Sequence, residues 1–294
     1  MKTAIIIPCR NEGINLKQTL DFILRTEARE KAAIVVIDDG SEDRCCDFLH
    51  AGSRSTSDYR QVKLLSAGGI GAARARNLGA EAVPEAEFLI FCDGHILMQR
   101  GWVDTLLDTF RIQEAAAACP GIGPFDPQQR AGYGQTWNDK LEIKWLPQPP
   151  DITEIPLAPG ACLAIKKEAF DAVGGFDRGF ESWGYEDVEL SLKLWLFGFR
   201  IFVNPQVKIG HRFRKTPPYR VDIVQIYYNR LRMAVSHFSE KRICKTISLL
   251  PDSQEKNCAL AKILLSDSLE QRKTYFKKRV YDDEWFFDKF RIPF

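Results

Sequence analysis

Short apolar segments alternate with amphipathic segments through residues 4–110 of this chain. The apolar segments have the length and β-branched content of buried strands, and the amphipathic segments repeat their apolar residues at helical spacing. Strands separated by helices need crossover connections, so the pattern predicts an α/β fold with a mostly parallel sheet flanked by helices. The expected strands are 4–7, 32–37, 62–65 and 88–92, and the expected helices are 14–24, 72–82 and 102–110.

Three of these expected strands end in polar clusters, at residues 8–12, 38–41 and 93–95. Open α/β sheets bind their ligands at the carboxyl ends of the strands. We therefore expect one site that is built from three strand ends.

The second half of the chain is less regular. Residues 119–160 are rich in Pro and Gly and predict a loop-rich insertion that carries Tyr133, Trp137 and Trp145. Beyond it we expect a strand at 160–165, a helix at 167–173, a helix at 187–196, a strand at 199–203, and amphipathic helices at 221–238 and 258–269. The expected units are a catalytic domain over 1–216 and a C-terminal helical extension over 217–294.

The charge of the chain is balanced overall but segregated along it. The net charge is +2, from 41 Lys and Arg against 39 Asp and Glu, which disfavours nucleic acid as the partner. Residues 208–245 hold ten bases and two acids, whereas residues 1–207 have a net charge of −7. This basic segment suits a small anion such as a diphosphate, and it is also a candidate for peripheral contact with an anionic membrane.

No apolar run reaches the length of a membrane helix, and the N-terminus lacks the features of a signal peptide, so we expect a cytoplasmic protein. The eight cysteines form no Cys-x-x-Cys pair. Buried free thiols are the favoured interpretation, because a zinc site is usually marked by paired ligand spacings.

Asp93 and His95 follow a buried strand at i, i+2 spacing, which directs both side chains to one side. A carboxylate with an imidazole suits a divalent cation, although a simple polar turn would look the same. His211, at the start of the basic segment, is a candidate third ligand or one more base of a phosphate-binding run.

Glu186 and Asp187 begin an expected helix, just after Trp183 and Gly184. Acids at a helix N-terminus are favoured by the helix dipole, so capping is one interpretation. Capping does not explain the preceding aromatic residues. A Trp beside a carboxylate can stack on a sugar ring, and the carboxylate then lies near a sugar hydroxyl as a base. Asp39 closes a strand, and its position fits either a turn or a carboxylate that binds a base or ribose.

These motifs together resemble glycosyltransferase family 2, of the nucleotide-sugar-dependent GT-A class. The matching segments are 5–12 (IIIPCRNE), 35–41 (VVIDDGS) with Asp43, 75–79 (ARNLG) and 91–95 (FCDGH). Segments 174–177 (GGFD) and 183–190 (WGYEDVEL) resemble the carboxyl-terminal motif of β-1,4-galactosyltransferases and of polypeptide N-acetylgalactosaminyltransferases. The resemblance covers roughly residues 3–215 and implies a Rossmann-like GT-A fold.

The resemblance also implies roles. Asp93, His95 and His211 would hold Mn²⁺ or Mg²⁺ on the diphosphate of a UDP-sugar, Asp39 would bind the uracil, and Asp187 would act as the base with Glu186 orienting the site. The remaining residues that it places at the nucleotide-sugar site are Pro8, Arg10, Glu12, Arg76, Gly160, Trp183 and Gly184.

The two halves of the resemblance point to different stereochemistry. His95 stands where family 2 usually has a second Asp, as in the polypeptide N-acetylgalactosaminyltransferases, which retain the anomeric configuration. The pair Glu186 and Asp187 matches inverting enzymes, and we favour inversion because the base is chemically required. The acceptor is expected to be a glycan, a peptide or a lipid-linked molecule, bound by 119–150 and the region beyond 216. A non-catalytic protein that binds sugar nucleotides, with its basic helices on a partner, is the other alternative.

Overall fold

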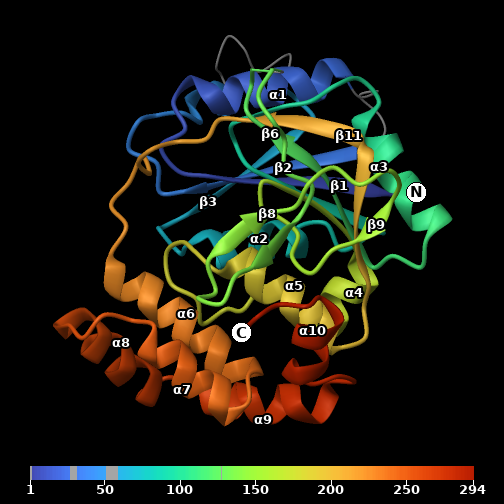
Figure 1. The fold of residues 1–294 in the computed structure, drawn as a ribbon. Helices are drawn as coiled ribbons and strands as arrows, with labels where there is room; N and C mark the ends of the chain where they lie inside the picture. The colour runs from blue at the N-terminus through green and yellow to red at the C-terminus, as the bar shows by residue number, and fades with distance from the viewer. Residues whose placement is uncertain (1, 27–31, 51–58, 127) are drawn as a thin grey trace.

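The computed structural model describes residues 2–26, 32–50, 59–126 and 128–294. Within these ranges a nine-stranded mixed sheet has the order β3-β2-β1-β4-β10-β6-β11-β5, and β9 pairs with β11 (Figure 1). Its strands are β1 (Thr3–Cys9), β2 (Ala32–Asp39), β3 (Val62–Ala67), β4 (Phe88–Cys92), β5 (Ile96–Leu97), β6 (Ala117–Gly123), β9 (Thr153–Glu154), β10 (Cys162–Lys166) and β11 (Ile201–His211). The predicted α/β architecture is confirmed.

The four strands predicted from the first half of the chain form one parallel part of the sheet, and β6 and β11 form another. β1 pairs in parallel with β2 and β4, and β2 pairs in parallel with β3. β10 runs antiparallel to both β4 and β6, which makes the sheet mixed. A separate hairpin consists of β7 (Gln135–Trp137) and β8 (Ile143–Trp145).

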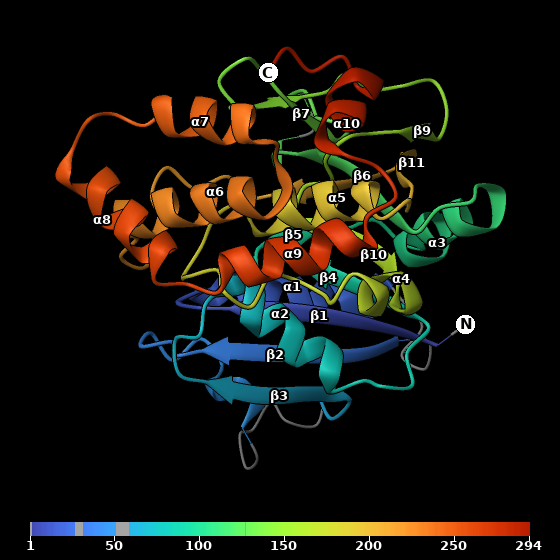
Figure 2. The ribbon, with the colours of Figure 1, turned by 90° about the horizontal axis from the view of Figure 1, so that it is seen from below.

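Helices cover both faces of the sheet (Figures 1 and 2). Alternate residues of a strand face opposite sides, so Ile5 and Ile7 join the core under α1, whereas Ala4 and Ile6 join the core on the other face. The helices are α1 (Ile14–Thr26), α2 (Ala72–Glu81), α3 (Trp102–Ile112), α4 (Lys167–Ala172), α5 (Glu186–Leu196), α6 (Ile223–His237), α7 (Glu240–Ser248), α8 (Gln254–Leu264), α9 (Ser268–Lys278) and α10 (Asp283–Lys289). None of these helices has both the length and the apolar character needed to cross a bilayer.

The C-terminal helices are joined to the rest of the protein by buried charged groups. Arg232 of α6 makes two hydrogen bonds with the Asp177 carboxylate, at 2.8 and 2.9 Å. His237, at the end of the same helix, lies 2.7 Å from Glu189 of α5, and Lys193 pairs with the same carboxylate at 3.1 Å. The helices of 217–294 thus share a polar core with the preceding part of the chain, and the predicted domain boundary at 216 stays a prediction.

The expectation of a loop-rich insertion over 119–160 is wrong at its start. Residues Ala117–Gly123 form β6, which is buried along its whole length between β10 and β11. The Pro and Gly residues of this strand are typical of loops, so the sequence did not indicate a strand here. Gly121 is required by packing, because a Cβ there would lie 2.4 Å from the Tyr133 ring. Tyr133 and Trp137 are themselves buried core residues, and of the three predicted aromatics only Trp145 is well exposed.

Two other boundaries differ from the expectation. The strand expected at 199–203 is β11, which continues to His211 through a shift of register between Asn204 and Lys208. The helix expected at 258–269 is wrong, because α8 ends at Leu264 and α9 begins at Ser268. The apolar residues at the junction, Leu264 and Leu265, are exposed rather than buried.

Candidate active site

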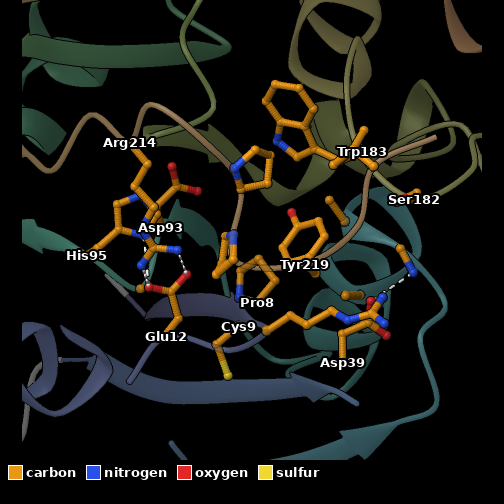
Figure 3. Close-up of a pocket in the computed structure, with 18 of the residues that line it drawn as sticks. Pro8, Cys9, Glu12, Asp39, Asp93, His95, Ser182, Trp183, Arg214 and Tyr219 are labelled. Carbon is orange, nitrogen blue, oxygen red and sulfur yellow. Dashed lines mark hydrogen bonds and ion pairs between the residues drawn. The ribbon is translucent and has the colours of Figure 1, made fainter. Parts of the chain in front are cut away.

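A pocket of about 590 Å³ lies at the carboxyl ends of β1, β2 and β4, as predicted from the polar clusters (Figure 3). This volume suits a small-molecule or cofactor ligand. The segment from His211 to Ile226, between β11 and α6, forms another wall of the pocket. The predicted site residues that line it are Pro8, Arg10, Glu12, Asp39, Arg76, Asp93, His95, Trp183 and His211.

Asp93, His95 and His211 form a cluster in which the potential ligand atoms all lie within 4.8 Å of one another. His211 Nε2 lies 3.1 Å from Asp93 Oδ2. Strand pairing produces this proximity, because the last residues of β11 pair with β5, directly after His95. His95 and His211 are 116 positions apart in the chain, and their ring centroids therefore lie only 4.7 Å apart.

The donor set of this cluster fits a divalent cation. His211 Nδ1 is buried and has no hydrogen-bond partner among the residues that the structure describes. Burial opposes ionisation of Asp93, but the contact with His211 and the charges of His95 and Arg76 lower the pKa of its carboxyl below the usual range. One carboxylate and two imidazoles are ligands that Mn²⁺ and related ions accept.

Glu12 contacts both the metal-type cluster of Asp93, His95 and His211 and the basic segment. One of its carboxylate oxygens lies 3.1 Å from His95 Nδ1, and Arg214 forms an ion pair with the same carboxylate (Figure 3). Glu12 is buried, so these contacts satisfy a charge that would otherwise be unfavourable there. Arg214 thus brings the basic segment, which the sequence predicted to suit a diphosphate, to the wall of the pocket.

Asp39 fixes the glycine-rich loop that precedes α2. Its two carboxylate oxygens accept hydrogen bonds from the backbone N–H groups of Ile70 at 2.6 Å and Gly71 at 2.9 Å. Gly71 has a φ of 89° and approaches Ser182 so closely that a Cβ would lie 2.9 Å from its backbone. Asp39 lines the pocket from this position, with both oxygens already engaged in shaping it.

Arg76 links the metal-type cluster to the start of α5. Its guanidinium contacts Glu186 at 3.0 Å and Asp93 at 3.3 Å, and the side chain is buried. Burial alone would lower the pKa of Arg76, but Glu186, Asp93 and Asp187 raise it. The resemblance placed Arg76 near a nucleotide, and the structure adds that it pairs with both Asp93 and Glu186.

Asp187 and Glu186 are not among the residues that line the pocket, but Glu186 contacts Arg76, which does line it. The two oxygens of Asp187 accept hydrogen bonds from the N–H groups of Gly160, at 2.8 Å, and Val188, at 2.9 Å. A Cβ at Gly160 would lie 3.1 Å from the Asp187 carboxylate, so a larger residue there would have to displace the carboxylate by a few tenths of an ångström. Burial and the neighbouring charge of Glu186 raise the pKa of Asp187 to about 6. Gly184 N–H in turn donates to Glu186 at 2.8 Å.

The turn that carries Trp183 has an unusual backbone. Ser182 and Tyr185 have positive φ angles, 50° and 70°, and Gly184 has a φ of 104°. Such conformations are uncommon for residues with a side chain and often occur at functional sites. Trp183 remains 47% exposed at the pocket, in a position to stack on a ligand.

Tyr219 is a pocket residue that sequence reasoning missed. Figure 3 shows its ring between Pro8 and Trp183, and the Arg10 guanidinium lies 5.3 Å from the ring centroid. Burial, together with the negative charges of Glu186 and Asp93, raises the pKa of Tyr219 to about 12, so it stays protonated as a hydrogen-bond donor. No spacing or motif marks a single Tyr in the segment after Pro218.

A second hollow adjoins the first on the side of His211. It shares His211, Arg212 and Phe213 with the main pocket and is further lined by Phe125, Trp145 and their neighbours. Trp145 and Phe213 are 40% and 52% exposed, and their rings contact each other edge to face. Exposed aromatic groups beside a polar site favour a binding surface.

Much of the basic segment is engaged within the protein. Arg214, Arg232 and Arg242 each pair with carboxylates. The charge that the sequence shows over 208–245 therefore divides between the pocket and internal ion pairs.

Comparisons with known proteins agree with this geometry. Residues 4–174 match the model of a family described as glycosyl transferase family 2, and residues 154–216 match one described as the N-terminal domain of galactosyltransferase. Polypeptide N-acetylgalactosaminyltransferase 12 of Mus musculus is 30% identical over 240 residues, which cover 74% of this chain and 41% of that protein. Polypeptide N-acetylgalactosaminyltransferase 10 of Homo sapiens is also 30% identical, over 74% of this chain and 39% of its own length. The chain thus spans about two fifths of the length of these relatives.

Two solved structures share the fold. The structure of GalNAc-T7 with UDP, GalNAc and Mn²⁺ superposes with a TM-score of 0.76 at 21% identity, covering 99% of this chain and 56% of that one. The structure of TarS residues 1–349 of S. aureus with UDP superposes with a TM-score of 0.56 at 17% identity, covering 97% and 77%.

Proposed function

This chain belongs to glycosyl transferase family 2, and on that premise we propose that it transfers a hexose or N-acetylhexosamine from a UDP-sugar to a nucleophile, in the usual case a hydroxyl. One observation carries the proposal: the cluster of Asp93, His95 and His211 lies in the same pocket as Asp39, Arg10 and Tyr219. A pocket with a cation site beside an aromatic and polar wall suits a nucleoside diphosphate. The structures of GalNAc-T7 and TarS, both with UDP, support the choice of UDP.

Mn²⁺ or Mg²⁺ held by Asp93, His95 and His211 would supply electrostatic stabilisation to the diphosphate leaving group. The protein's own residues prepare that site. Glu12 orients the His95 ring from one side, and Arg76 holds Asp93 from the other. Such supporting contacts commonly tune the ligands of a metal site.

The nucleoside would lie against Tyr219 and Pro8, beside Asp39. Tyr219 offers a flat face for a base and, as a protonated phenol, a hydrogen bond. Trp183 offers a second aromatic surface, which suits the sugar. Arg214 and Arg212 line the same pocket and would add positive charge beside the phosphates.

For the chemical step we propose inversion, with Asp187 taking the proton of the acceptor. Its pKa of about 6 suits a base that works near neutral pH. Gly160 and Val188 fix the carboxylate by their N–H groups, and Glu186 is occupied by Arg76 and Gly184. The proton would pass from the acceptor oxygen to Asp187 as the new bond to the anomeric carbon forms and the bond to the diphosphate breaks.

The relatives favour a second candidate, a retaining transfer of N-acetylgalactosamine to peptide. Both relatives are named polypeptide N-acetylgalactosaminyltransferases, and the sequence resemblance places His95 in the metal motif of such enzymes. The acceptor would lie in the hollow lined by Phe125, Trp145 and Phe213, which adjoins the metal-type cluster.

A donor screen tests the proposed function. The protein is incubated with Mn²⁺ and a panel of UDP-hexoses and UDP-N-acetylhexosamines, with peptide, glycan and lipid-linked acceptors, and released UDP is measured. Proton NMR of the fresh product then gives its anomeric configuration. A β linkage from an α donor supports inversion, and an α linkage supports the retaining candidate. The absence of metal-dependent UDP release with every donor would refute both.

A further inference from the structure

Three cysteines, none of them in a Cys-x-x-Cys motif, lie close together beside the pocket. Cys9 ends β1, whereas Cys45 and Cys46 follow the loop after β2. The sulfur of Cys46 lies 3.4 Å from that of Cys9 and 3.9 Å from that of Cys45, and all three sulfurs lie within 4.8 Å of one another. Each side chain is at most 6% exposed.

These separations match those of thiolates that share a metal ion. Sulfurs bound tetrahedrally to Zn²⁺ at about 2.3 Å are about 3.8 Å apart, which follows from the geometry of the tetrahedron. A disulfide would join only two of the sulfurs and leave the third buried beside it. A single ion would use all three.

Oxygen groups lie on the Cys45 side of the cluster. Ser41 Oγ is 3.4 Å from the Cys45 sulfur. Asp43 accepts the backbone N–H of Cys45 at 3.0 Å and that of Gly13 at 2.7 Å. A fourth ligand, from Ser41, Asp43 or a water, would complete the tetrahedron that zinc prefers.

We propose that Cys9, Cys45 and Cys46 form a second metal site, which binds Zn²⁺ or a similar thiophilic ion and is separate from the cluster of Asp93, His95 and His211. The site is structural. It joins the end of β1 to the loop after β2, next to the residues that shape the pocket. Asn11 already connects these segments, since its N–H donates to Ser41 Oγ and its side-chain oxygen accepts from Glu42 N–H. The proposal does not depend on the proposed function.

The site is tested on the full chain, purified without chelator, with Zn²⁺ added and excess removed by dialysis. Metal analysis should find about one tightly held zinc per chain in the three-thiolate site, in addition to any zinc in the other cluster, whose imidazoles also bind zinc. Reconstitution with Co²⁺ should give thiolate-to-cobalt charge-transfer absorption, which the nitrogen and oxygen ligands of the other cluster cannot produce. Cys46→Ser should lose the tightly held metal and this absorption. Cys258→Ser, at an exposed cysteine, and His95→Ala, in the other cluster, should keep both.

A measurement on the unaltered protein keeps the test decisive if Cys46→Ser fails to fold. Titration with a mercurial reagent should release the zinc as the buried thiols react, and a chromophoric chelator reports that release. Failure of the unaltered protein to hold zinc or cobalt through thiolates overturns the proposal. A Cys9–Cys46 disulfide in the zinc-treated protein, detected by mass spectrometry, overturns it as well.

Discussion

Replacing Asp187 with asparagine removes a carboxylate whose pKa burial and the charge of Glu186 raise from 3.8 to about 6. In the folded protein this raised pKa opposes ionisation. The shift corresponds to about 3 kcal/mol, at about 1.4 kcal/mol per pKa unit. Because the folded pKa is above the unfolded one, the stability that protonated Asp187 contributes is fully present below pH 3.8 and is lost as the pH rises through 6.

The stability falls as the pH rises, whereas the activity should increase. A base must be ionised, so kcat/KM should rise as the pH increases through about 6. Asp187→Asn should lower the rate about 10²- to 10⁴-fold, which is the usual contribution of a positioned base. Binding of UDP should persist, since Asp187 does not line the nucleotide pocket.

The stability of the variant separates two effects. Both oxygens of Asp187 accept backbone N–H groups, and an asparagine amide can accept only one of them, so a loss of about 1–3 kcal/mol independent of pH is expected. The pH-dependent part of the difference in unfolding free energy reports the raised pKa of Asp187, separately from the lost hydrogen bond. Between pH 4 and pH 8 the unfolding free energy of the unaltered protein should fall by about 2 kcal/mol relative to the variant, because at pH 4 the unfolded carboxyl is already more than half ionised.

The assays are pH–rate profiles with a saturating acceptor and urea unfolding at a series of pH values. Asp171→Asn is the matched control, because Asp171 is exposed and pairs with Lys167 on the surface of α4. A variant at Asp187 with full activity, or with an unchanged acid limb, would refute the base assignment. Parallel pH dependence of stability in the two proteins would refute the raised pKa.

Three further substitutions test other parts of the structure. Gly160→Ala places a Cβ 3.1 Å from the Asp187 carboxylate, so kcat should fall at least about tenfold with UDP affinity unchanged; equal kcat would contradict the need for this close approach. His211→Ala should abolish Mn²⁺-dependent binding of UDP in calorimetry, and unchanged metal dependence would exclude it as a ligand. Arg232→Ala leaves Asp177 buried without its partner and should lower the unfolding free energy by about 3–5 kcal/mol in urea titrations, whereas a loss below about 1 kcal/mol would show that the pair is not needed.

The parts of the fold that the sequence predicted are those with a local signal. β1, β2 and β4 are apolar runs that end in polar clusters, and α2 has a composition that forms helices well. β6 carried the opposite local signal, because Pro120, Gly121 and Gly123 usually indicate a loop. Its neighbours β10 and β11 override that preference, since burial in the sheet decides β structure more than intrinsic propensity does.

The same distinction holds within the site. Asp93 and His95 could be paired from their spacing, because i, i+2 residues of an extended segment point to one side. The convergence of Cys9 with Cys45 and Cys46 has no such signal. It arises because β1 and β2 pair in parallel with Cys9 opposite Asp38, which places the loop after β2 beside the end of β1. Register between strands is a property of the whole sheet, and no spacing rule reports it.

His211 is a site residue whose position could not be predicted from the local sequence. The motifs implied that it is a ligand, but the local sequence left it equally consistent with one more base in a basic run. Its position depends on the length of β11, on the shift of register between Asn204 and Lys208, and on pairing with the two residues of β5. Without that shift, each later side chain of β11 would meet a different partner, because a slip of one residue reverses the face that a side chain occupies. The irregularity in β11 is therefore part of the metal-type site, and changes of chain length between Asn204 and Lys208 should disrupt that site as surely as changes to the ligand itself.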